Sequence, residues 1–180
     1  SIGFDNQKAM CRMAKKVIDL GHRNLALVSA ETILNDRAKA RQLGIEDALV
    51  AANLCAKTLH IVKTTYGIEE GATAFEQVMK AAPQTTAVFC GNDVLAVGAL
   101  RRARELGFKV PQDVSIIGFD DIELAEIAYP ALTTVHVPHR EMGRRAAEAL
   151  IKLLNEGTQI EAVELEASLV FRDTLAPARK

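Results

Sequence analysis

Short apolar runs alternate along the chain with stretches in which apolar residues recur every three or four positions. The first pattern predicts buried strands and the second predicts amphipathic helices. Strands are expected at residues 2–4, 24–29, 59–63, 86–90 and 114–118. Helices are expected between them, at residues 7–20, 33–53, 68–81 and 94–106. This alternation, with nearly continuous apolar strands, is typical of an α/β fold whose parallel sheet is covered by helices on both faces.

Residues with special backbone preferences set the expected helix ends. Gly21 and Gly107 each follow a predicted helix, as glycine does at helix C-termini. Pro83 ends the helix at 68–81, and Asp93 is expected to cap the helix at 94–106. After residue 120 the regular rhythm breaks. An extended segment at 132–137, a helix at 140–154 and two strands at 163–166 and 169–172 are then expected.

Composition and charge narrow the class of protein. The 180-residue chain has 22 basic and 23 acidic residues, so its net charge of -1 gives no reason to expect binding to nucleic acid or an anionic membrane. Cys11, Cys55 and Cys90 lie far apart and are odd in number, which favours a reducing cytoplasm over a disulfide framework. No apolar run approaches the length that spans a membrane. We therefore expect a cytoplasmic globular protein.

Polar residues collect where the predicted parallel strands end. In such sheets ligands bind beyond the carboxyl ends of the strands, here the loops at 30–41, 64–66, 91–93 and 118–121. These loops supply arginine, asparagine, aspartate and one aromatic ring, which suits a small polyhydroxylated ligand. The alternative for Asp93 and Asp121 is a purely local role as helix caps or turn formers. For Tyr66 the alternative is a half-buried core position.

Signals of catalysis or metal binding are weak. The sequence has no nucleophile elbow, phosphate-binding loop or zinc-protease helix motif. His136 and His139 stand three apart, but no acidic or cysteine cluster accompanies them, so surface histidines are favoured over a metal pair. His22, which follows Gly21, is interpreted as a turn residue. We expect no enzyme activity, no cofactor and no metal.

Six segments resemble motifs of the lactose-repressor (LacI/GalR) family of transcription regulators. Residues 91–99 match "N-D-x-x-A-x-G-A", residues 110–121 match "V-P-x-D-[IV]-S-[VI]-x-G-[FY]-D-[DN]", and residues 130–135 match "P-x-L-T-T-[IV]". Residues 21–26, 37–44 and 169–174 resemble three further family segments. The motifs follow in order at family spacing over nearly the whole chain.

The resemblance implies a two-lobed effector domain of the periplasmic-binding-protein type, preceded in the family by a helix-turn-helix headpiece. We interpret this chain as a fragment without the headpiece, so operator DNA would be bound only through that absent part. The expected division has four parts: residues 1–6 are a remnant of the N-terminal lobe and crossover, 7–131 the C-terminal lobe, 132–156 a segment returning to the N-terminal lobe, and 157–180 the final strands of the C-terminal lobe.

The resemblance also implies ligand-binding residues. Sugar-binding relatives place arginine, asparagine and aspartate at the positions of Arg41, Asn92 and Asp120, with an aromatic ring near Tyr66. We add Arg37, from the same loop as Arg41, to the expected site. The purine-responsive relative has glycine at the position of Asn92, so the asparagine favours a sugar or sugar derivative. The implied function is a homodimeric repressor that senses such an effector; the alternative is a periplasmic sugar-binding protein of a transporter.

Two surfaces are expected to pack against something outside the lobe. The family resemblance puts part of a dimer interface on the helix at 94–106 and the short segment after it; a purely core-facing helix is the alternative. The expected interface residues are Val97, Leu100, Arg101, Arg104 and Leu124. The helix at 140–154 carries an apolar stripe, Met142, Ala146, Leu150, Ile151 and Leu154. Burial of such a stripe is favourable, so we expect it either to pack on a second chain or to fold back over the ligand cleft.

Overall fold

A four-stranded parallel sheet forms the centre of the molecule in the computed structural model, which describes residues 1–156 and 161–179. Its strands are β2 (Leu25–Ser29), β3 (His60–Lys63), β4 (Ala87–Cys90) and β5 (Ser115–Ile117), in the order β3-β2-β4-β5. All three pairings are parallel. The four strands lie within the ranges that the apolar runs predict.

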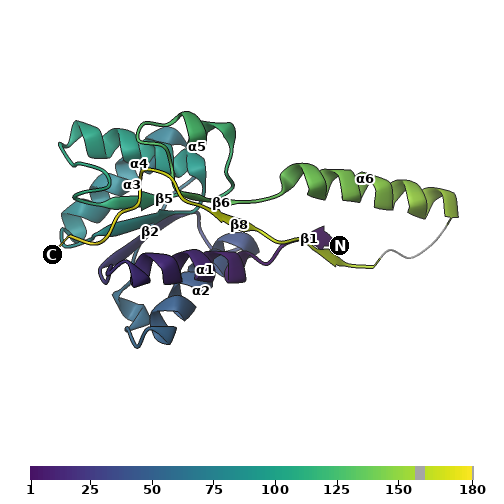
Figure 1. Cartoon of the computed structure of the whole chain (residues 1–180), viewed down its shortest axis with the longest axis horizontal. Coiled ribbons are helices and arrows are strands. Elements are labelled where there is room, and N and C mark those ends of the chain that lie inside the picture. The colour runs from purple at the N-terminus through teal and green to yellow at the C-terminus, as the bar shows by residue number, and fades with distance from the viewer. Residues whose placement is uncertain (157–160, 180) are drawn as a thin grey trace.

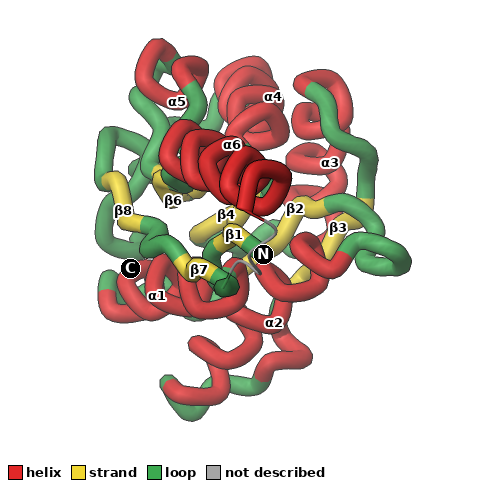
Figure 2. Tube along the Cα trace, turned by 90° about the vertical axis from the view of Figure 1, so that its right-hand side faces the viewer, coloured by secondary structure: helices red, strands yellow, loops and turns green. Residues whose placement is uncertain are grey.

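Helices cover both faces of this sheet, as Figure 2 shows. One layer holds α1 (Asn6–Asp19) and α2 (Asp36–Ala51), and a short 3-10 helix, η1 (Ala56–Thr58), follows α2. The opposite layer holds α3 (Ile68–Ala81), α4 (Asp93–Glu105) and α5 (Glu123–Ile127). We call this sheet with its helices α1 to α5 the lobe. The predicted fold class, a parallel sheet with helices on both faces, is confirmed.

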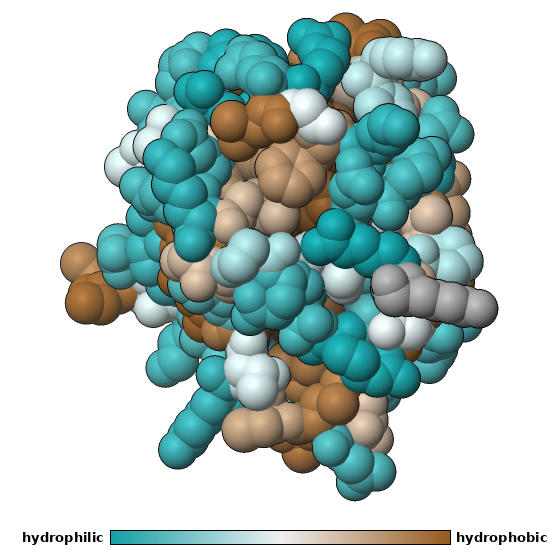
Figure 3. Space-filling model, turned by 90° about the vertical axis from the view of Figure 1, so that its left-hand side faces the viewer, coloured by the Kyte–Doolittle hydropathy of each residue, from teal (hydrophilic) through white to brown (hydrophobic). Residues whose placement is uncertain are grey.

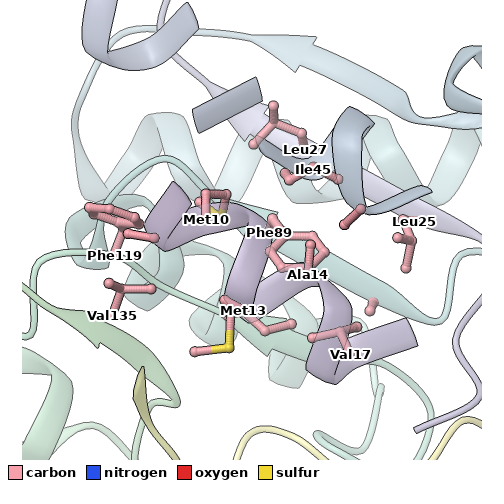
Figure 4. Close-up of a cluster of buried hydrophobic side chains, with 14 of the residues drawn as sticks. Met10, Met13, Ala14, Val17, Leu25, Leu27, Ile45, Phe89, Phe119 and Val135 are labelled. Carbon is pink, nitrogen blue, oxygen red and sulfur yellow. The ribbon is translucent and has the colours of Figure 1, made fainter. Parts of the chain in front are cut away.

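Two apolar cores, one on each face of the sheet, hold the lobe together. In the core under α1, the side chains of Met10, Met13 and Val17 are fully buried and lie among residues of the sheet (Figure 4). Strand residues alternate between the cores: Leu27 belongs to this one and Val28 to the other. Because both faces are covered, every residue of β2 is buried.

Two strand pairs lead out of the lobe. β6 (Thr134–His136) pairs antiparallel with β8 (Ser168–Val170), and β1 (Ile2–Gly3) pairs parallel with β7 (Val163–Glu164). Between β6 and β7 lies α6 (His139–Glu156), which extends away from the lobe (Figure 1). Val135 and Val137 are buried in the core under α1, so the chain leaves the lobe only where α6 begins.

Of the two packings expected for α6, folding back over the ligand cleft is wrong, while packing on a second chain stays a prediction. Its first turn approaches the lobe, where Met142 packs against the core, but the rest of the helix projects outward. Leu150, Ile151 and Leu154 are all exposed. The face of the lobe at the opposite end is mostly polar, with apolar atoms visible only in patches (Figure 3).

Two predicted helix starts are also wrong. The helix expected from residue 33 begins at Asp36, because the side chain of Asn35 caps it by accepting a hydrogen bond from the Ala38 amide at 3.0 Å. The apolar residues Ile33 and Leu34 that extended the predicted helix are exposed loop residues. For α4 the cap is Asn92 rather than Asp93, which is instead the first residue of the helix.

His22 is not the turn residue that its place after Gly21 suggests. Its ring is buried, with Nδ1 2.9 Å from the Thr86 hydroxyl and Nε2 2.9 Å from the carbonyl oxygen of Ala176. The ring therefore joins the segment before β2 to the residue before β4 and to the C-terminal segment. Because a charged imidazolium is poorly solvated there, burial lowers the pKa of His22.

Candidate functional site

A hollow of about 700 Å³, open to solvent, lies at the carboxyl ends of the parallel strands, where the lobe meets β1 and the start of α6. The structure brings all five sequence-predicted ligand residues to its wall: Arg37, Arg41, Tyr66, Asn92 and Asp120. They come from four different strand-to-helix loops or helix starts. This is the position at which parallel sheets present ligand sites.

Arg41 is the most buried charged residue of the hollow, with 7% of its surface exposed. Its guanidinium carbon lies 3.8 Å from the centroid of the Phe119 ring, a cation–π contact. Its Nε donates to Asn6 Oδ1 at 2.9 Å, and its Nη1 donates to the Gly91 carbonyl oxygen. These contacts fix the guanidinium plane, so its remaining donors are held toward the hollow.

Asp120 supplies the negative charge opposite Arg41. Its Oδ1 lies 3.6 Å from Arg41 Nη2. Burial raises the pKa of Asp120, although Arg41 opposes that shift, and burial lowers the pKa of Arg41. Desolvation thus outweighs the attraction for both partners. Hydroxyl groups of a ligand, which both donate and accept hydrogen bonds, would restore part of the lost solvation.

Asn92 lines the hollow and also caps a helix. Its side-chain oxygen accepts a hydrogen bond from the Leu95 amide at 2.9 Å and so caps α4. The cap uses the carboxamide oxygen and leaves the NH₂ group as a donor toward a ligand. The cap therefore leaves the NH₂ group of Asn92 available at the wall of the hollow.

Tyr66 and Arg37 lie at the rim. The side chain of Tyr66 has 47% of its surface accessible and belongs to neither apolar core, so it does not take the half-buried core position that was the alternative. Arg37 stands in the first turn of α2 and is also exposed. An accessible ring and an accessible guanidinium can both adapt to a ligand that enters from solvent.

Sequence reasoning missed the wall residues that come from β1, α1 and α6. Asn6 begins α1, while His139 and Met142 belong to the first turn of α6. The sequence interpretation of His139 was a plain surface histidine, and its side chain is exposed, yet it stands at this wall. No local signal marks these positions, because their approach depends on how the chain crosses between β1, α1 and α6.

A second carboxylate, Asp93, is buried beneath the site. Its Oδ1 accepts from the Thr134 hydroxyl at 2.6 Å and its Oδ2 from the Ile122 amide at 2.9 Å. Burial raises the pKa of Asp93 to about 6, because these two hydrogen bonds only partly replace water. Its side chain is therefore structural and lies outside the wall of the hollow.

Within residues 1–156 and 161–179, no group of histidine, cysteine, aspartate and glutamate side chains is placed to hold a metal ion. The Nδ1 of His136 lies 2.9 Å from Asp121 Oδ2, a contact with a single carboxylate. Among the same residues, no helix has the length and apolarity needed to cross a membrane.

The predicted dimer residues lie around a shallow depression of about 250 Å³ between α4 and the segment after α5. Val97, Leu100, Arg101 and Arg104 line it, together with Ala128 and Tyr129. Leu124 is not among its lining residues, and Leu100 packs mainly in the core. The most exposed apolar side chains nearby are instead Ile127 and Tyr129, with 76% and 90% of their surfaces accessible.

Comparison with known proteins identifies the family. Residues 14–175 match the periplasmic binding protein-like domain. The repressor PurR of Vibrio vulnificus is 34% identical over 174 residues, which are 96% of this chain and 52% of that protein. The ribose operon repressor of Haemophilus influenzae is 33% identical over 162 residues, 89% of this chain and 48% of that protein.

A solved structure of a protein from the same family has a similar fold. It is a LacI family transcriptional regulator from Enterococcus faecium with bound ribose, with a TM-score of 0.93 and 28% identity over 99% of this chain and 66% of that one. The chain therefore belongs to the family of periplasmic binding protein-like domains, as an effector-binding region of the LacI/GalR type. It spans about half the length of the curated relatives it matches. Both of those relatives are named as transcription repressors.

Proposed function

We propose that the hollow binds a sugar or sugar derivative as the effector of a transcription repressor. The observation that carries this proposal is the convergence of five predicted ligand residues on one wall, with Arg41 fixed opposite Asp120. The ring of Tyr66 offers a surface for the apolar face of a sugar, and Asn92 offers a neutral donor. Two relatives support a pentose: one is named a ribose operon repressor and another holds bound ribose.

The test is a titration of the ¹⁵N-labelled 180-residue chain with D-ribose, followed by NMR. Shift changes should centre on the loops that carry Arg41, Asn92 and Asp120. Because the hollow is open to solvent, we expect a dissociation constant on the order of 1 mM. Parallel titrations with a hexose and a purine nucleobase separate the ligand classes.

Asp120→Ala should weaken D-ribose binding by about 1–3 kcal/mol, because ligand hydroxyls would lose a charged acceptor. Asp113→Ala is the matched control: Asp113 caps the Lys109 amide near the opposite end of β5 and is remote from the hollow. Unchanged affinity in Asp120→Ala would refute the proposed site. Binding of the purine alone would keep the site but reject a sugar as its ligand.

The same proposal extends to the whole protein. A helix-turn-helix part of the full-length protein would bind operator DNA in the cytoplasm, and effector binding here would alter that affinity. The repressor names of the relatives support this function over a periplasmic sugar-binding protein of a transporter. A gel-shift titration should find no sequence-specific DNA binding by these 180 residues, because their net charge is -1.

The proposed homodimer would use α4 and the segment after α5. Exposed Ile127 and Tyr129 adjoin the depression lined by Val97 and Arg104, and this apolar centre with a charged rim is typical of an interface. Arg101 would contribute less than the sequence suggested, because Glu69 already holds it through hydrogen bonds of 2.6 and 2.7 Å.

Sedimentation of Tyr129→Glu tests the interface. The variant should sediment as a monomer at concentrations where the parent chain is a dimer, since a charge would be buried in the contact. Tyr129 is a better position than Leu100, whose substitution would also disturb the core. Leu106→Glu, an exposed position beyond the depression, serves as control. A parent chain that is monomeric at every concentration would contradict the proposal.

We also propose that β1, β7 and α6 belong to the second lobe of the effector domain. The two-stranded β1–β7 sheet lies beside the start of α6 and is separate from the four-stranded sheet. Residues 132–137 would then be a connector whose buried part stays with the lobe described here. In a longer protein that includes the second lobe, amides of α6 should exchange with solvent more slowly than in this chain.

A further inference from the structure

The loop that carries Asp120 has a costly backbone conformation. Asp120 and Asp121 both have positive φ angles, 111° and 56°, a region that favours glycine. Such conformations persist when surrounding contacts over-determine them, and they are common where a side chain must be aimed at a ligand. The contacts that hold this loop therefore bear on how Asp120 reaches the hollow.

The carboxylate of Asp121 contacts two side chains, an arginine and a histidine. Its Oδ1 accepts from Arg172 Nη1 at 2.8 Å, and its Oδ2 lies 2.9 Å from His136 Nδ1. Because an ionised carboxylate can only accept, that imidazole nitrogen must carry the proton. Arg172 Nη1 also donates to the Leu132 carbonyl oxygen at 3.0 Å. We call Asp121, Arg172 and His136 the Asp121 clamp.

The backbone on both sides of Asp121 is fixed as well. The Asp120 amide donates to the Val135 carbonyl oxygen at 2.9 Å. The Ile122 amide donates to the buried carboxylate of Asp93. The backbone is thus fixed on both sides of Asp121, which sets the direction in which the Asp120 side chain leaves the main chain.

The partners of the loop lie on the segments that connect the lobe to α6 and β7. Val135 and His136 belong to β6, which leads into α6, and Arg172 follows β8, which pairs with β6. Arg172 and Asp121 are mostly buried, with side-chain exposures of 20% and 15%, so their pairing is little screened by water. The loop of Asp120 is therefore in direct contact with the strands through which the chain leaves the lobe.

We propose that Asp121 and Arg172 are positioning residues: they aim Asp120 at the effector and couple the occupied site to β6 and hence to α6. This inference rests on the proposed role of Asp120 in effector binding. Neither residue lines the hollow, so both act through Asp120. Effector binding would then be read out at the connecting strands without a direct contact to them.

The first experiment is a double-mutant cycle measured by NMR titration with D-ribose. Arg172→Met should weaken binding about tenfold in the parent chain, because Asp120 loses its fixed direction. In the Asp120→Ala background the same substitution should have no further effect, since its only route to the ligand is gone. Arg172→Lys, which keeps the charge, should restore part of the affinity. Arg23→Met, which removes an arginine that donates to the carbonyl oxygens of Ile18 and His22, is the matched control.

The second experiment needs no ligand. In the free chain, Arg172→Met should raise the hydrogen-exchange rate of the Asp120 amide about tenfold or more, because the loop opens locally. Amides of β2 and β4 should keep their rates, which excludes general unfolding. With D-ribose present, the shift changes in β6, which does not line the hollow, should disappear in this variant.

The outcomes separate the two proposals. If Asp120→Ala does not change D-ribose binding, or if D-ribose does not bind, the proposed function fails for that ligand, while the exchange rate of Asp120 still tests the clamp. Equal losses of affinity from Arg172→Met in both backgrounds would overturn the positioning role, as would an unchanged exchange rate of the Asp120 amide.

Discussion

Helices α1 and α6 carry the same kind of amphipathic pattern, but the apolar face is buried in α1 and largely exposed in α6. In α1, Met10, Met13 and Val17 are fully buried against the sheet and α2. In α6, Ile151 and Leu154 keep 59% and 75% of their surfaces exposed. Periodicity tells which residues share one face of a helix. It does not tell which surface lies opposite that face, and only the neighbouring elements supply that surface.

The largest expected effect concerns this contrast directly. Leu27→Ala should lower the free energy of unfolding by about 2–5 kcal/mol, because it leaves a cavity in a closed core. Leu154→Ala removes the same atoms from an exposed position and should change stability by no more than about 0.5 kcal/mol. Urea denaturation followed by circular dichroism measures both. If Leu154→Ala lowers the free energy of unfolding nearly as much as Leu27→Ala does, the apolar face of α6 is covered in solution, and the contrast with α1 is wrong.

The contrast also explains how much of the fold the sequence predicts. Strands such as β2 and β4 are short apolar runs buried on both faces, so their location follows from the local sequence pattern alone. The start of α2 was predicted too early because Ile33 and Leu34 are apolar, although the structure exposes both. Burial is a property of the whole fold, and a local apolar pattern stands for it only where neighbours are present on both sides.

The candidate site divides in the same way. Arg41, Asn92 and Asp120 were predicted because they follow strands, and parallel strands place their ends side by side. Asn6 and His139 could not be predicted, because they reach the hollow through the crossover segments beside β1 and α6. The buried ring of His22 was missed for a similar reason, since its partner Ala176 lies 154 residues away along the chain.

The lobe and α6 also differ in the pKa shifts of their carboxylates, and this difference predicts how the free energy of unfolding depends on pH. Asp93 is buried and its pKa is raised from 3.8 to about 6. Between these two values the folded chain holds more protons than the unfolded chain, so the free energy of unfolding falls as pH rises through this window. Above pH about 6 the ionised form costs on the order of 1–3 kcal/mol. Asp120, whose pKa is also raised by burial, acts in the same direction.

Asp93→Asn should flatten this part of the pH profile and stabilise the chain at pH 7. An asparagine oxygen can accept from the Ile122 amide while its NH₂ group donates to the Thr134 hydroxyl, so the buried contacts are kept. His22 titrates in the opposite sense, but its contribution is common to both chains and cancels in their difference.

Glu141→Gln is the control from α6. Hydrogen bonds from Arg144 and then Arg145 lower the pKa of Glu141 to about 2, but this carboxylate is partly exposed, so solvent screening should leave only a small change in the unfolding profile. Urea denaturation at a series of pH values measures all three chains. A profile that is flat in the parent chain, or equally steep in Asp93→Asn, would contradict the assignment to Asp93.

The smallest expected effect sharpens the comparison inside the lobe, at the N-terminus of α4, where fold and site share one side chain. Asn92→Ala should cost about 1 kcal/mol of stability, because the Leu95 amide loses its cap. Asn92→Ser should keep nearly all of that stability, since serine is an equally good cap. Both variants lose the NH₂ donor and should weaken D-ribose binding alike. The serine variant should therefore lose affinity while it keeps its stability, whereas the alanine variant should lose both. Urea denaturation and the NMR titration together decide: if Asn92→Ser binds D-ribose as well as the parent chain does, Asn92 is a helix cap and takes no part in ligand binding.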